Sequence, residues 1–208
     1  MEAKDLTLEQ AEEMARAAVD SLASKISEMN ELVLEPTKHL QEFAELTPGP
    51  RMLDVGCGWG RYVERFVELG FEYLGIDLSP EMVRLCRTTH PLLRFEAMSF
   101  RKLDFPDESF DALWCCCSLG TEPKRNMQNV LAELRRVLVQ DGLLYVMLPD
   151  IDEYGEQIVP IFDEGSPEAL NVHWDPDEFR EELSNAGFQY MTLERIFWMG
   201  TMVLTARK

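Results

Sequence analysis

The sequence predicts an α/β fold, in which a doubly wound and mostly parallel sheet carries helices on both faces. Short apolar runs alternate with helical patterns from residue 51 to residue 188, which is typical of parallel strands joined by crossover helices. The run at residues 143–148 is apolar throughout, as expected of a strand that is covered on both sides. Helical segments also precede the first strand, so we expect an N-terminal helical cap on the sheet.

Residues 1–47 are expected to form this cap. Thr7 and Gln10 have the spacing of a capping box at the start of a helix, and apolar residues follow at intervals of three and four. A second, short helix is expected near residues 38–46. The sequence TPGP at residues 47–50 then ends the cap, because prolines cannot continue a helix.

The central part of the chain, residues 51–148, is expected to hold five strands separated by helices. Ser79 and Pro80 form the N-cap and first residue of one helix, and Gly70 ends the helix before it. An apolar stripe that begins at Met127 predicts another helix before the fifth strand. The strands are predicted at residues 52–55, 73–77, 92–96, 110–117 and 143–148.

The rest of the chain is expected to complete the same domain. Residues 149–174 show no clear pattern and are predicted to be an irregular lid or substrate segment, with a short helix after residue 167. Residues 175–208 are predicted to form a helix, which begins with the same cap-and-proline pattern, and two strands. These strands are predicted at residues 190–196 and 201–206. Because no linker is evident, residues 1–208 are expected to form one domain.

The composition disfavours several classes of partner. The chain has 38 Asp and Glu against 20 Lys and Arg, a formal net charge of −18, which repels nucleic acid and anionic membranes. No apolar run approaches the about 18 residues that a membrane-spanning helix needs. The acidic N-terminus does not resemble a signal peptide. We therefore expect a cytoplasmic protein without a nucleic-acid or membrane partner.

Five cysteines, three of them adjacent at residues 115–117, do not make the even pattern of a disulfide framework. They are interpreted as reduced thiols that serve as small buried hydrophobic residues. Adjacent residues of a strand point to opposite faces of a sheet, so the three cannot chelate one ion. No metal site is predicted.

A glycine-rich loop between the first strand and the next helix is the strongest functional signal. Gly56 and Gly58 lack side chains, so a ligand can approach the backbone closely where amide groups are exposed. Alone, the loop fits equally well a tight turn without a ligand. Asp77 ends the second strand about 20 residues later, where a carboxylate can bind ribose hydroxyls. Together they predict a nucleoside-containing ligand.

Two details argue against a dinucleotide as that ligand. The loop has the spacing G-x-G-x-G and not G-x-G-x-x-G. Asp54 stands directly before the loop, where its carboxylate would repel a pyrophosphate and suit a ligand with a positive group. An NAD-dependent oxidoreductase is therefore a disfavoured alternative.

Four segments of the chain, over roughly residues 51–148, resemble motifs of the class I S-adenosylmethionine-dependent methyltransferases of the small single-domain kind. They are LDVGCGWGR at residues 53–61, GIDLSPEMV at 75–83, FPDESFDALWC at 105–115 and LAELRRVLVQDGLLYV at 131–146. In the last, Gln-Asp-Gly replaces the usual Pro-Gly-Gly. The resemblance implies a Rossmann-like sheet of seven strands with the last strand antiparallel.

The resemblance also implies a cofactor, S-adenosyl-L-methionine, and a product, S-adenosyl-L-homocysteine. Asp54 would face the ammonium group of the methionine portion, Asp77 would hold the ribose, and Leu78 would pack on the adenine. Ser99 occupies the position where the family usually has an acid that accepts from the adenine amino group, and a serine accepts more weakly. The cofactor-binding residues expected from the resemblance are Asp54, Gly56, Cys57, Gly58, Asp77, Leu78, Ser99, Phe100 and Cys117.

The implied reaction is in-line transfer of the sulfonium methyl group to a small-molecule acceptor, in which the protein mainly supplies proximity and orientation. His173 is the candidate general base, if one is needed. Further candidates are His39, Glu122, Asp152, Tyr154 and Glu156. A protein methyltransferase and a non-catalytic S-adenosylmethionine-binding module are the alternatives. The acceptor atom, the acceptor and the oligomeric state are left open.

Overall fold

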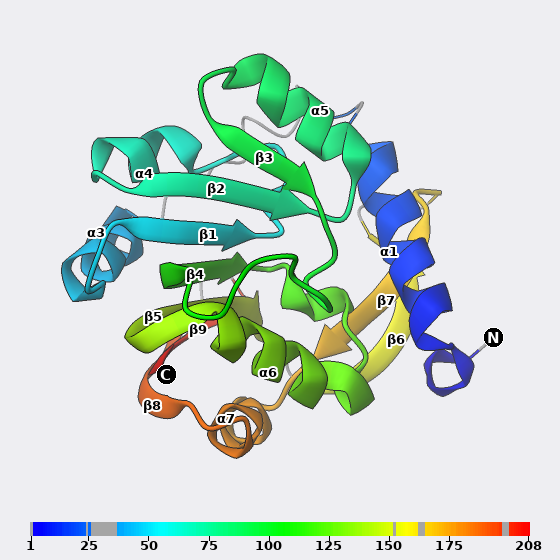
Figure 1. The fold of residues 1–208 in the computed structure, drawn as a ribbon. Coiled ribbons are helices and arrows are strands. Elements are labelled where there is room, and N and C mark those ends of the chain that lie inside the picture. The colour runs from blue at the N-terminus through cyan, green and yellow to red at the C-terminus, as the bar shows by residue number, and fades with distance from the viewer. Residues whose placement is uncertain (1, 24, 26–36, 152, 162–164, 197–199) are drawn as a thin grey trace.

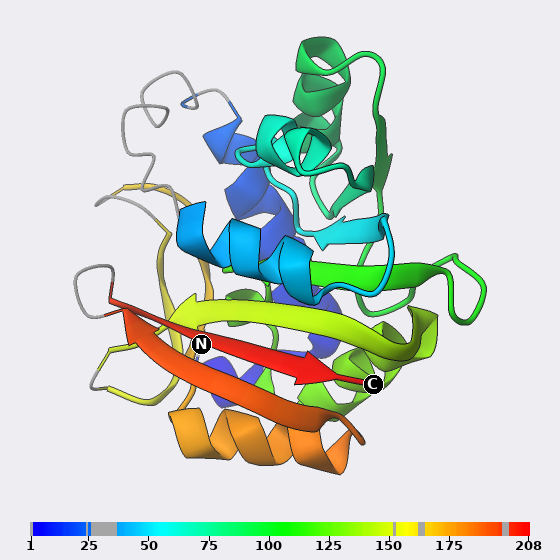
Figure 2. The same ribbon diagram turned by 90° about the vertical axis from the view of Figure 1, so that its left-hand side faces the viewer.

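The computed structural model of the chain describes residues 2–23, 25, 37–151, 153–161, 165–196 and 200–208. Its centre is a seven-stranded sheet with the order β3-β2-β1-β4-β5-β9-β8. Strands β1 to β5 pair in parallel, whereas β9 lies antiparallel between β5 and β8, as Figure 2 shows. The predicted sheet, with its antiparallel last strand, is confirmed. The strands are β1 (Arg51–Val55), β2 (Glu72–Asp77), β3 (Arg94–Ala97), β4 (Phe110–Cys116), β5 (Leu138–Pro149), β8 (Gln189–Ile196) and β9 (Thr201–Arg207).

Helices cover both faces of this sheet. One face packs against α3, α4 and α5, and its core contains several aromatic rings, among them Trp114 stacked on Tyr145 with ring centroids 3.7 Å apart. The other face packs against α6 and α7. These helices are α3 (Thr37–Leu46), α4 (Val63–Glu68), α5 (Pro80–Thr89), α6 (Met127–Val137) and α7 (Pro176–Asn185).

The predicted helix starts are confirmed in atomic detail. Thr7 and Gln10 form a reciprocal capping box at the start of α1 (Leu8–Leu22). Ser79 caps α5 by accepting a hydrogen bond from the Met82 amide at 3.1 Å, and Asp175 caps α7 in the same way. The part of the predicted cap at residues 26–36 lies outside the described residues. Among the helices that are described, none is long and apolar enough to cross a membrane.

One helix and one hairpin lie across the carboxyl edge of the sheet, the edge toward which β1 to β4 point (Figure 1). The helix is α1, which buries Ala11, Ala15, Ala18 and Leu22. The hairpin consists of β6 (Gly155–Pro160) and β7 (Glu168–His173). Both elements therefore stand over the position where α/β folds of this type bind ligands.

The hairpin contradicts the prediction that residues 149–174 are irregular with a short helix after residue 167. Residues 168–173 form β7 and bury Ala169, Leu170 and Val172. Both strands are short, and their contacts come from segments far away in the sequence: β7 packs on α1, and β6 contacts residues 3–5. The helix α1 and the hairpin stabilise each other, which a pattern in one segment cannot show.

Candidate functional site

The glycine loop turns tightly between β1 and α4. The amides of Gly56 and Cys57 both donate to the Ile76 carbonyl, at 2.8 and 2.9 Å, and so attach the loop to β2. Gly56 has a φ of +77°, and a Cβ atom there would lie 2.4 Å from the Cβ of Ser118. Gly58 has a φ of +54°, and no heavy atom lies within 4 Å of the place where its Cβ would be. The loop thus needs glycine at one position to fit β4 and leaves the other open to a ligand.

Asp77 connects this loop to the end of β2. Its Oδ2 accepts the Gly58 amide at 2.8 Å, and its Oδ1 accepts the Ser79 amide at 2.9 Å. Only 6% of the residue is exposed. Burial raises the pKa of Asp77, and the two amides partly offset that increase. A carboxylate oxygen can accept more than one hydrogen bond, so the ribose role stays a prediction that this geometry allows.

Asp54 lies beside Asp77 in the sheet and is 4% exposed. The Tyr73 hydroxyl donates to its Oδ2 at 2.8 Å. Burial raises the pKa of Asp54 to about 7; the Tyr73 hydrogen bond lowers it and the charge of Asp77 raises it further. A buried carboxylate with so little compensation is stabilised by a nearby cation. The site therefore fits a ligand with a positive group, as the sequence predicted.

The residues predicted to hold the adenine lie against α1. Leu78, Ser99 and Phe100 line a cavity of about 10 Å³ together with Glu12 and Ala15 of that helix, which is roughly the space of one water molecule. The Ser99 hydroxyl donates to Glu12 Oε2 at 2.8 Å. Thus α1 places a carboxylate beside Ser99, where the resemblance implies an acid. No sequence pattern indicates this contact, since the two residues are 87 positions apart.

Two more polar contacts hold α1 over the carboxyl edge. The Ser79 hydroxyl, which caps α5, also donates to Asp20 Oδ1 near the end of α1. The Arg101 guanidinium donates to the Leu8 carbonyl at 2.5 Å at the other end of the helix. The helix is therefore attached at both ends to residues that follow β2 and β3.

The cysteines at the end of β4 differ from the prediction. Cys115 is buried, Cys116 is partly buried and Cys117 is exposed, so the interpretation of all three as buried hydrophobic residues was wrong for Cys117. Its backbone has a φ of +57°, because β4 ends at Cys116 and the chain turns. A hydrogen bond with Cys116 and the charge of Arg61 lower the pKa of the Cys117 thiol. Its predicted cofactor contact stays a prediction.

Two of the candidate bases are held by other groups. His173 is buried in β7, with Nδ1 3.2 Å from the Glu153 carbonyl oxygen. Glu122 is buried and accepts hydrogen bonds from Arg101 at 2.8 Å and Asn126 at 2.6 Å. Tyr154 directly precedes β6, and its hydroxyl accepts a hydrogen bond from Arg195 at 3.1 Å. Glu156 lies within β6. Asp152 lies outside the described residues.

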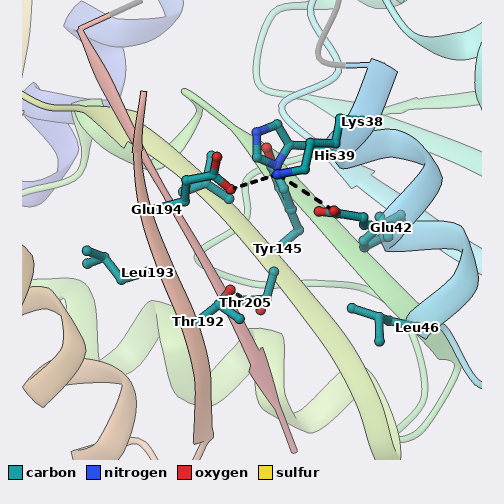
Figure 3. A pocket seen from close by; sticks show the side chains of 11 residues that line it. Lys38, His39, Glu42, Leu46, Tyr145, Thr192, Leu193, Glu194 and Thr205 are labelled. Atoms are coloured by element: carbon teal, nitrogen blue, oxygen red, sulfur yellow. Dashed lines mark hydrogen bonds and ion pairs between the residues drawn. The ribbon is translucent and has the colours of Figure 1, made fainter. Parts of the chain in front are cut away.

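His39 lines a separate cavity of about 320 Å³ between α3 and the face formed by β5, β9 and β8. Figure 3 shows its imidazole above Tyr145, beside Lys38. The Lys38 Nζ lies 3.8 Å from Glu42 and 3.6 Å from Glu194. The structure thus brings together the residues of the glycine loop, β1 and β2, but places His39 in a different cavity.

Residues 52–142 match the model of a family described as methyltransferase domain. A demethylmenaquinone methyltransferase of Tropheryma whipplei is 35% identical over 105 residues, which are 49% of this chain and 42% of that protein. A putative methyltransferase of Bacillus subtilis, YqeM, is 36% identical over 107 residues, or 49% of this chain and 43% of that protein. The chain spans less than half the length of these curated relatives.

Solved structures show the same fold over nearly the whole chain. The 1,6-didemethyltoxoflavin-N1-methyltransferase of Burkholderia thailandensis, solved with 1,6-didemethyltoxoflavin and S-adenosylhomocysteine, superposes with a TM-score of 0.67 at 23% identity, covering 98% of this chain and 92% of that one. The sheet order and the glycine loop thus define the class I methyltransferase fold. The resemblance predicted from the sequence is confirmed: the core of the chain is similar to methyltransferase domains in sequence, and the whole chain is similar to S-adenosylmethionine-dependent methyltransferases in fold.

Proposed function

We propose that the chain binds S-adenosyl-L-methionine and transfers its methyl group to a small-molecule acceptor. The observation that carries this proposal is the direct hydrogen bond between Asp77 at the end of β2 and the Gly58 amide of the glycine loop. It holds the Asp77 carboxylate beside an open stretch of backbone at the carboxyl edge of the sheet, and this arrangement supports a role of Asp77 in binding ribose hydroxyls.

The residues of this edge fit the cofactor in charge and shape. Gly58 leaves space for close approach, and the buried Asp54 supplies a negative charge for the ammonium of the methionine portion. Leu78 and Phe100 offer apolar contact on the adenine side. Because the cavity beside them is so small, binding of the adenine at this place requires α1 to shift.

The chemistry requires little beyond orientation. When bound, the cofactor supplies an activated methyl group on a sulfonium sulfur, so the protein need not activate it. Asp54 and Asp77 would hold the methionine portion and the ribose of the cofactor, and the reacting atoms need to be held about 3–3.5 Å apart and in line. A general base is needed only if the acceptor must lose a proton before it attacks the methyl group.

An apolar cluster supports a small organic acceptor. Leu22 of α1 and Met82 of α5 pack together beside Trp59 of the glycine loop and Ile161 of the hairpin. The Tropheryma relative is named as a demethylmenaquinone methyltransferase, and the Burkholderia enzyme as a 1,6-didemethyltoxoflavin methyltransferase; both names refer to small molecules. The formal charge of −18 disfavours polyanionic acceptors.

The cofactor is tested by thermal and chemical unfolding with S-adenosylhomocysteine and, separately, with NAD. A ligand at about 100 times its Kd adds about 2.7 kcal/mol to the free energy of unfolding. We expect this increase with S-adenosylhomocysteine only, and its loss in Asp77→Ala. Asp111→Ala is the matched control, because Asp111 is a buried carboxylate at the start of β4 that binds Arg51. A shift with NAD alone would refute the proposal.

The acceptor class is tested with cofactor carrying a labelled methyl group. The protein is incubated with a small-molecule extract and, in parallel, with a protein extract. We expect label in the small-molecule fraction. Label in protein alone would establish a protein methyltransferase, and binding without transfer to either extract would favour a non-catalytic module.

A further inference from the structure

Asp54 has an unusual partner on the neighbouring strand. Asp54 pairs with Gly75 in the β1–β2 register, yet its hydrogen-bond donor is Tyr73, two residues earlier on β2. Tyr73 and Gly75 lie on the same face of the strand because side chains alternate. The Tyr73 ring therefore extends along β2 and carries its hydroxyl over Gly75 to the Asp54 carboxylate.

Gly75 makes this contact possible. A Cβ atom at residue 75 would lie 2.9 Å from the Tyr73 hydroxyl oxygen, 2.8 Å from the Phe95 ring and 3.0 Å from the Cys57 sulfur. Contacts this short require the neighbours to move, and the nearest polar one is the hydroxyl that binds Asp54. Since Gly75 is inside a strand, where glycine is unfavourable, its position is explained by the space that Tyr73 occupies.

The Tyr73 hydroxyl is the sole hydrogen-bond donor to Asp54 within the described part of the chain. The other carboxylate oxygen of Asp54, Oδ1, accepts no hydrogen bond from the described residues. The other titratable groups that act on Asp54, or on which Asp54 acts, come from β2, the glycine loop and β4: Tyr73, Asp77, Cys57, Cys115 and Cys116. Burial raises the pKa values of the Tyr73 hydroxyl and the Cys115 thiol, so both stay protonated near neutral pH.

The hydrogen bond from the neutral Tyr73 hydroxyl thus opposes protonation of Asp54. Burial and the charge of Asp77 favour the neutral acid, whereas the Tyr73 hydrogen bond favours the ionised form, and the resulting pKa is about 7. Loss of that hydrogen bond would leave Asp54 largely protonated at neutral pH. A protonated Asp54 cannot attract a cation.

We propose that Tyr73 is a positioning residue of the cofactor site, whose hydroxyl keeps Asp54 ionised and oriented for the cofactor's ammonium group. Gly75 provides the space for that hydroxyl. The inference rests on the proposed function, and it adds a residue that does not itself touch the cofactor. It requires that affinity for an ammonium-bearing ligand depend on pH through Asp54, and that Tyr73 set the position of that dependence.

The test measures the Kd of S-adenosylhomocysteine between pH 6 and pH 8.5 for the full chain, by calorimetry. The variants are Tyr73→Phe and Tyr145→Phe. Tyr145 is a matched control because it is a buried tyrosine of the same apolar cluster, and its hydroxyl has no hydrogen-bond partner among the described residues. Both substitutions keep the ring and remove one oxygen.

In the wild type we expect affinity to rise with pH and level off above about pH 8, one unit above the pKa of Asp54. In Tyr73→Phe the whole curve moves to higher pH: an increase of one pKa unit lowers the affinity at pH 7 about fivefold, and the affinity recovers toward pH 8.5. The Tyr145→Phe curve coincides with that of the wild type.

Gly75→Ala gives an independent readout. Because its methyl group would displace the Tyr73 hydroxyl, we expect the same upward movement of the curve, and no further movement when it is combined with Tyr73→Phe. A Tyr73→Phe curve that coincides with Tyr145→Phe, or that is lower by a constant factor at every pH, would overturn the inference and leave the proposed function intact. Absence of binding by the wild type at every pH would overturn both.

Discussion

Asn in place of Asp54 should make the ligand-free protein more stable at neutral pH. Burial raises the pKa of Asp54 from 3.8 to about 7, so the folded state binds a proton in this range that the unfolded state releases. The contribution of Asp54 to stability is therefore full below about pH 4 and is lost as the pH rises to about 7. A difference of about three pKa units corresponds to a loss of about 4 kcal/mol.

Asp54→Asn removes this loss while keeping the shape of the side chain. Its amide oxygen still accepts the hydrogen bond from the Tyr73 hydroxyl, so that hydroxyl keeps its partner. We expect the variant and the wild type to have similar free energies of unfolding near pH 4. The variant should then gain about 1.4 kcal/mol per pH unit relative to the wild type, up to about 4 kcal/mol at pH 8.

Urea unfolding followed by tryptophan fluorescence at several pH values measures this difference. Asp77 and Glu122 also have raised pKa values, but they are present in both proteins and cancel when the two curves are subtracted. Parallel stability curves for the variant and the wild type would refute the reasoning. The same variant should lose the pH dependence of S-adenosylhomocysteine affinity.

Three further substitutions test the packing around the site. Gly56→Ala should cost about 2 kcal/mol or more and lower the Tm, because its methyl group would overlap the Ser118 side chain at a φ of +77°; an unchanged Tm would contradict this. Arg51→Ala should cost about 1 kcal/mol at pH 7, where the half-exposed Arg51 lowers the pKa of Asp111, and progressively less as the pH falls through that lowered pKa and Asp111 becomes protonated; a loss that stays constant in urea unfolding down to the most acidic pH at which the protein folds would exclude the ion pair as the cause. Ser79→Ala should cost about 1 kcal/mol through the lost cap and speed amide hydrogen exchange in α1, which it helps to hold; unchanged exchange in α1 would show that the contact is unimportant.

Features that depend on neighbouring residues were predicted well from the sequence. The capping box at Thr7, the Ser79-Pro80 helix start and the strand-loop-helix around Gly56 all appear where they were expected. Each depends on hydrogen bonds or backbone angles within a few residues, so the residue types are sufficient to specify them. The sequence also predicted that Asp54, the glycine loop and Asp77 lie close together, because parallel strands end at a common edge of the sheet.

Features that depend on contacts between distant segments were not predicted. Strand β7 of the hairpin packs on α1, and Ser99 donates to Glu12, 87 positions away. Tyr73 of β2 donates to Asp54 of the neighbouring strand β1. Cys117 is exposed because β4 ends one residue early. None of these features follows from a local sequence pattern, because each depends on which segments pack together in the folded chain.

The sequence by itself determined the class of fold, the glycine loop and the two acidic residues at the carboxyl edge, since periodicity and turn chemistry act over short distances. Only the tertiary structure decided which hydroxyl would donate to Asp54, which helix would lie against Leu78 and Ser99, and how deeply each carboxylate would be buried. Burial sets the electrostatic cost of a charge, and burial exists only after the chain has folded.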